Sequence, residues 1–173
     1  MHVNTLRPLL AAGLLLGIAM HPAAHADAGK AAPAPNGITL PADYADWRLV
    51  APSYRTDKHH VRAILGNDKA IQAARSGRTK PWPDGAILAK VAWKEQAHER
   101  FPTALEAGAF SHVEIMVKDS KRFKDTDGWG YARWVGKELK PYGQDAGFVQ
   151  ECHGCHTPVA DNDFVFTAPV ALP

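Results

Sequence analysis

Residues 86–93 read Ala-Ile-Leu-Ala-Lys-Val-Ala-Trp, and their side chains alternate with a period of two. On an extended chain, one face would carry Ile87, Ala89, Val91 and Trp93, and the other would carry Ala86, Leu88, Lys90 and Ala92. Residues 112–117 repeat the pattern, with Val113, Ile115 and Val117 opposite His112, Glu114 and Met116. Such alternation is typical of β-strands, so we expect a sheet with two unlike faces at the centre of the fold.

Further strands are expected on both sides of this pair, at residues 48–54, 60–65 and 129–135. A helix is expected over residues 67–74, with Asn67 as its N-cap and Gly77 as its C-terminal stop. A second short helix is expected over residues 145–156. About five strands with short connections predict the α+β class, a mainly antiparallel sheet with short flanking helices.

The charge balance argues against two kinds of partner. The 173 residues include 20 Lys and Arg against 18 Asp and Glu, a formal net charge of +2. Nucleic-acid and polybasic membrane binders carry a strong excess of Lys and Arg, so we expect neither partner. The length suits one domain with one core.

The N-terminus has the three-part pattern of a secretory signal peptide. Arg7 precedes an apolar run over residues 9–20, and Ala24-His25-Ala26 forms a small-x-small cleavage site. The alternative, an uncleaved anchor, would need an apolar run of about 20 residues. We therefore expect cleavage after Ala26, a periplasmic location and no membrane span after processing. Residues 27–37 are rich in Ala and Pro and predict a flexible leader, with the domain over 38–173.

The sequence Cys152-His153-Gly154-Cys155-His156 carries the clearest chemical signal. Cys-x-x-Cys-His is the attachment signature of haem c: both thiols share one helical face, and the imidazole follows one turn along. It predicts one covalent haem held through Cys152 and Cys155, with His156 as axial ligand to the iron. A thioredoxin-like or disulfide pair and a zinc site are the alternatives, but neither a βαβ context nor a second ligand pair is evident.

The sixth iron ligand separates an electron carrier from a ligand-binding site. Only 17 residues follow His156, and none is Met or His. Met116 is the one methionine after the signal peptide, and its strand position indicates packing. His112, on the same strand face, stays a weaker ligand candidate. We expect an open distal site, which makes a plain electron-transfer cytochrome the less favoured reading.

Taken together, these features resemble the cytochrome P-460 family, which includes cytochrome c′-β. The resemblance runs in order along nearly the whole processed chain. It rests on Tyr44, Trp47, Arg62, the Trp-Pro-Asp-Gly turn at 82–85, residues 117–123, Gly128-Trp129, the haem motif and residues 161–167.

The resemblance implies a mostly antiparallel β domain, a homodimer and a five-coordinate haem. Its cytochrome P-460 branch oxidises hydroxylamine and bonds a lysine to the porphyrin rim, at the position of Lys90 here. The cytochrome c′-β branch lacks this bond and binds nitric oxide in a hydrophobic distal pocket. From the residues alone, Lys90 stays ambiguous: apolar Leu88 and Ala92 flank it on its own face, but Lys94 lies next on that face.

Hydroxylamine oxidation would also need a pocket base, with an electron-accepting cytochrome as a further partner. Glu114 and His112 are the candidates for the base. Gly147 departs from the resemblance, because active relatives carry a pocket side chain there. Arg62, Phe110, Trp129, Tyr131 and Trp134 are candidate pocket residues, with a structural role as the alternative for each.

Overall fold

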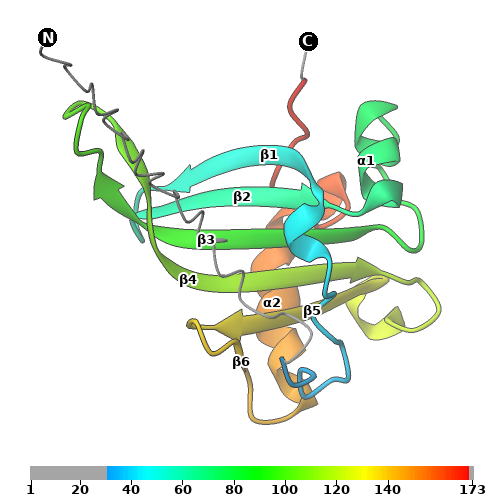
Figure 1. Ribbon diagram of the computed structural model, residues 1–173. Helices are drawn as coiled ribbons and strands as arrows, with labels where there is room; N and C mark the ends of the chain where they lie inside the picture. The colour runs from blue at the N-terminus through cyan, green and yellow to red at the C-terminus, as the bar shows by residue number, and fades with distance from the viewer. Residues whose placement is uncertain (1–30, 172–173) are drawn as a thin grey trace, which may run out of the picture.

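The computed structural model describes residues 31–171, and the expected signal peptide and cleavage site lie outside them (Figure 1). One six-stranded antiparallel sheet is ordered as in the sequence, each strand pairing with its neighbours along the chain. Its strands are β1 (Arg48–Arg55), β2 (His60–Gly66), β3 (Ile87–Ala97), β4 (Leu105–Lys118), β5 (Trp129–Val135) and β6 (Lys140–Pro141). Antiparallel neighbours can be joined by short turns, and the longer links here contain α1, between β2 and β3, and η3, between β4 and β5.

The helices are short. Two are α-helical, α1 (Asp68–Arg75) and α2 (Val149–His156). The 3₁₀ turns are η2 (Tyr44–Asp46), η3 (Lys124–Thr126), η4 (Ala146–Phe148) and η5 (Thr157–Asn162). Within residues 31–171, no helix is long and apolar enough to cross a membrane.

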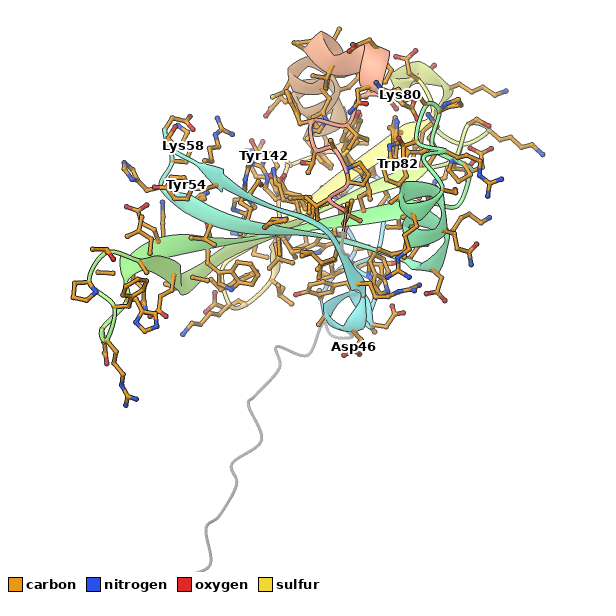
Figure 2. All side chains as sticks on the ribbon, turned by 90° about the horizontal axis from the view of Figure 1, so that it is seen from above. Asp46, Tyr54, Lys58, Lys80, Trp82 and Tyr142 are labelled. Carbon is orange, nitrogen blue, oxygen red and sulfur yellow. The ribbon has the colours of Figure 1, made fainter. Side chains whose placement is uncertain are left out.

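The two faces of the sheet bury different cores, whereas the length of the chain suggested a single core. Ala89, Val91, Val113 and Ile115 pack against the segment that precedes β1. The other face packs against α1, α2 and the C-terminal segment, through a core that includes Ile71, Leu88, Trp129 and Val165. Figure 2 shows Asp46 of η2 on one side of the sheet and α2 on the other. The motif-bearing helix therefore lies over the face that carries Lys90.

The α+β class and the five expected strands are confirmed. β6 was not foreseen, because two residues are too few to show a period. β3 and β4 run beyond the alternating stretches into a long hairpin, where the register shifts around Trp93 and interrupts the pattern. The second helix divides into η4 and α2, since Asp145 caps the 3₁₀ turn by accepting a hydrogen bond from the Gly147 amide at 2.8 Å.

The described end of the leader, from residue 31, packs against the sheet. Ala34 is 3% exposed, and the Trp134 indole donates a hydrogen bond to the Ala32 carbonyl at 2.8 Å. The expectation of a flexible leader rested on its lack of large apolar side chains. Small alanine side chains can also be buried, as Ala34 is, and the backbone carbonyl of Ala32 accepts the hydrogen bond from Trp134.

Asn67 joins α1 to the sheet. Its Oδ1 accepts hydrogen bonds from the Ala70 amide at 3.0 Å and the Ile87 amide at 3.1 Å. The hydrogen bond from Ala70 caps α1, and the one from Ile87 ties the same side chain to the start of β3. Asn67 therefore helps to fix the orientation of α1 relative to β3.

Asn67→Ala should lower the free energy of unfolding by about 1–2 kcal/mol, because one cap and one acceptor to the sheet are lost. Urea denaturation followed by circular dichroism measures the change. Gln72→Ala, an exposed position on the same helix, is the control and should leave the midpoint unchanged. Equal midpoints for Asn67→Ala and the wild type would contradict this role.

Candidate haem site

The three motif residues lie on α2, as the sequence predicts. Cys152 is half-buried and contacts the cores on both faces of the sheet, whereas Cys155 is exposed. Neither cysteine forms a disulfide bond in this structure. Burial raises the pKa of the Cys152 thiol. The thiols stand three residues apart on one helix, which is the spacing that two thioether bonds to one porphyrin need.

The His156 imidazole is oriented by the chain that follows it. Its Nδ1 lies 2.6 Å from the Phe164 carbonyl oxygen. A carbonyl only accepts hydrogen bonds, so Nδ1 carries the proton and Nε2 keeps a free lone pair. Burial lowers the pKa of His156, which favours the neutral imidazole that a metal requires. His156 is therefore prepared to ligate iron through Nε2.

A row of charged side chains crosses the sheet on the face that α2 covers. Lys90, Glu114 and Arg133 stand directly opposite one another on β3, β4 and β5. Glu114 forms an ion pair with Lys90 and a second with Arg133, whose Nη2 lies 2.5 Å from Oε1. Burial alone would raise the pKa of Glu114, but the two cations outweigh it and lower the pKa from 4.5 to about 2. Glu114 is thus a carboxylate at neutral pH.

Two histidines extend this row along the same face. His112 Nε2 lies 3.5 Å from Glu114 Oε1, and burial lowers the pKa of His112 from 6.5 to about 4. The His60 ring lies edge-on to His112, with centroids 5.5 Å apart. Both histidines have lowered pKa values, mainly through burial. His112 is therefore neutral at neutral pH.

Several buried polar atoms on this face are left without partners by residues 31–171. They are Ser53 Oγ, His60 Nε2, Arg62 Nε, Trp129 Nε1, Tyr131 OH and Arg133 Nε. The strand register places all six residues on the face of Lys90 and Glu114. Buried polar groups are normally satisfied, so this cluster indicates a missing polar partner. Haem, with its two carboxylates, is such a partner, and the donors present fit it.

The charged row and the motif helix act on each other electrostatically. The charges of Lys90 and Glu114 both shift the pKa of His156, and those of Glu114 and Arg133 shift that of Cys152. The Tyr131 ring contacts His156 with centroids 5.3 Å apart. The fold therefore brings Lys90, Glu114 and His112 to the side of the sheet that carries His156.

The other sequence candidates divide between the two faces. Arg62 and Tyr131 lie on the α2 side, where Trp129 and Met116 belong to the core. Phe110 and Trp134 pack on the opposite face, away from the motif. His60 lies at the start of β2, where a strand was expected, and its Nε2 is buried.

Arg133 is the site residue that sequence reasoning missed. It lies within an aromatic-rich stretch that reads as an ordinary strand. Arg133 is two residues from Tyr131, so the two side chains share a face of β5. That this is also the face of Glu114 follows only from the pairing register of β4 and β5, which the sequence does not show.

A cavity of about 650 Å³ lies at β6 and η4, and the residues that line it do not include Lys90, Glu114 or Arg133. Its lining includes Tyr142, Gly147 and Glu151. The Tyr142 hydroxyl donates to Glu151 at 3.0 Å, and the Arg133 guanidinium lies 4.8 Å from the Tyr142 ring centroid. Gly147 thus faces the cavity with no side chain, at the position where the resemblance expects one.

Comparison with known proteins agrees with this geometry. The family model described as cytochrome P460 matches residues 41–167, which is most of the chain and includes the motif. A search of the curated proteins found no match.

Glu114→Gln should lower the free energy of unfolding at neutral pH by about 1–3 kcal/mol, because two partly buried cations lose their anion. A carboxylate with a lowered pKa stabilises the fold above its unfolded pKa, and this stability is lost on acidification. The gap between wild type and Glu114→Gln should therefore close as pH falls from 4.5 towards 2.

Urea denaturation over a series of pH values measures this gap. Glu106→Gln, on the same strand but in its outer part, is the control and should show little gap at any pH. A gap for Glu114→Gln that is independent of pH would contradict the assignment.

Proposed function

The chain belongs to the cytochrome P460 family, and from this premise we propose that it is a periplasmic mono-haem c protein that oxidises hydroxylamine at a five-coordinate iron. Cys152 and Cys155 would hold the haem, and His156 would ligate the iron. When bound, the haem supplies a metal that binds the substrate nitrogen and accepts its electrons, to be passed to an electron-accepting cytochrome.

The charged row supports this proposal over the alternative. A nitric-oxide binder of the cytochrome c′-β type is expected to have a hydrophobic distal pocket. Here the face that carries Lys90 bears Glu114 and Arg133 in direct ion pairs, with His112 beside them. A charged pocket suits a substrate that must lose protons as it is oxidised, whereas nitric oxide binding needs no proton transfer.

Glu114 is the base in this proposal. Its carboxylate is ionised at neutral pH and can accept a proton from a bound N–H or O–H group. Lys90 and Arg133 hold it in place. Two cations also make it a weak base, because they stabilise the carboxylate over the protonated acid.

A covalent bond between Lys90 and the porphyrin would make Glu114 a stronger base. The bond replaces one N–H and one C–H bond, a two-electron oxidation that requires a two-electron oxidant such as a peroxide. A nitrogen attached to an aromatic ring is a far weaker base than an alkylamine, so Lys90 would lose its positive charge. Glu114 would then keep Arg133 as its main cationic partner, and its pKa would rise towards a range useful for proton transfer.

Purified holoprotein should reduce an artificial electron acceptor in the presence of hydroxylamine, and Glu114→Gln should lower the rate about 100-fold or more. Glu106→Gln is the matched control and should retain the wild-type rate. The variant with both Cys152 and Cys155 replaced by Ser gives the haem-free background. No consumption of hydroxylamine above that background would refute the enzymatic proposal.

Nitric-oxide binding is the second candidate, because Gly147 leaves the cavity without the side chain expected of active relatives. Tight binding of nitric oxide by the ferrous protein, together with no turnover of hydroxylamine, would favour this reading.

Peptide mass spectrometry should find haem joined both to the peptide with Cys152 and Cys155 and to the peptide with Lys90. The Lys90 bond should remove two hydrogen atoms from the combined mass and shift the ferrous Soret band strongly to the red. Lys90→Arg keeps the charge but cannot form the same bond, so it should show haem on the cysteine peptide alone. Wild-type protein with that same result would make Lys90 an ion-pair partner only.

A further inference from the structure

A second ion pair lies at the far end of β4, outside the charged row. Lys118 Nζ lies 2.7 Å from Asp163 Oδ1, and the two side chains are 8% and 11% exposed. Removing two charges from water is costly unless both are well paired. Lys118 ends β4, and Asp163 follows the motif helix by seven residues. Sequence resemblance singled out both segments, and the proposed function uses neither.

Both charges make additional contacts. Lys118 Nζ donates to the Asp127 carbonyl at 3.3 Å and lies 4.9 Å from the Trp129 ring centroid. The second carboxylate oxygen of Asp163 accepts from the Trp82 amide at 2.7 Å. The pair therefore joins the C-terminal segment to the end of the sheet and to the loop before β3.

Asp163 begins a short backbone stretch that needs support. Asp163 and the next residue, Phe164, both have left-handed conformations, with φ of 49° and 62°. Left-handed conformations are unfavourable for residues other than glycine, because the Cβ atom approaches the backbone too closely. This geometry turns the chain back towards α2 and brings the Phe164 carbonyl oxygen to 2.6 Å from His156 Nδ1.

We propose that the Lys118–Asp163 ion pair is a positioning device for the proximal histidine. It holds the left-handed turn that presents the Phe164 carbonyl to His156. A hydrogen bond at Nδ1 makes the imidazole a stronger donor to a metal and fixes the ring plane. The ion pair thereby sets the strength of the iron–histidine bond and the reduction potential of the haem. It does so without a direct contact between His156 and either Lys118 or Asp163.

A second contact braces the same turn against α2. The Phe164 ring stacks on His153 at a centroid distance of 5.2 Å, and His153 Nε2 lies 2.8 Å from an Asp127 carboxylate oxygen. Since Lys118 binds the Asp127 carbonyl, one ammonium group touches both loops that hold the end of the motif helix.

The test uses the holoprotein and does not require turnover of hydroxylamine. Its result is therefore independent of whether the proposed hydroxylamine oxidation is correct. Lys118→Met and Asp163→Asn each remove the ion pair. In both, the ferrous iron–histidine stretch in resonance Raman spectra should move to lower wavenumber, and the midpoint potential should rise, because a weaker donor stabilises ferric iron less. Lys118→Arg keeps the charge and should lie between these variants and the wild type. Lys121→Met, which removes an exposed cation three residues away, should change neither quantity.

Loss of stability alone has to be separated from loss of positioning. The double variant Lys118→Met and Asp163→Asn leaves no buried charge unpaired and keeps a side-chain oxygen for the Trp82 amide, so it should recover thermal stability relative to Lys118→Met. The proposal requires its Raman band and potential to stay shifted. Single variants that lose stability but keep the wild-type band and potential would overturn the proposal, as would recovery of both in the double variant.

Discussion

The pairing of the central strands depends on the ionised carboxylate of Glu114. Glu114 lies in the C-terminal half of the longest strand, on the face that the motif helix covers, and its largely buried carboxylate needs cations beside it to stay ionised. Lys90 and Arg133 supply them from the strands on either side. Because directly opposed residues share a face, the ion pairs also fix the register of β3, β4 and β5. A slip of one residue on either neighbouring strand would turn a cation into the opposite, apolar core.

The strand register also gives the two faces of the sheet different properties. The face built from Val91, Val113 and Ile115 is a conventional apolar core, and it supplies stability. Apart from the Lys118–Asp163 ion pair, the face of Glu114 is apolar towards the end that carries Leu88 and Trp129, and it becomes polar towards His60 and Arg62. One sheet thus has an apolar packing face on one side and a partly polar face, on which the candidate haem site lies, on the other.

The sequence predicts the strands well because their period-two signal comes from burial on two faces. It also locates the motif residues, since Cys-x-x-Cys-His depends only on local spacing. Arg133 and the Lys118–Asp163 pair escaped prediction for the opposite reason. Arg133 pairs with Glu114, 19 residues away, and Lys118 pairs with Asp163, 45 residues away. The sequence does not show such distant contacts, because they depend on strand pairing and on the turn after α2. The packing of Ala34 escaped because a small side chain gives no pattern.

The position of α2 in the chain bears on how the protein matures. Every strand of the sheet pairs with its sequence neighbour, so the sheet can assemble from local hairpins as the chain emerges. The motif helix comes after all of them, has eight residues and buries none of them fully. A helix of that length has little stability of its own. We therefore expect α2 to dock after the sheet has formed, which would leave both thiols accessible for haem attachment while the sheet that the ring packs against is already in place.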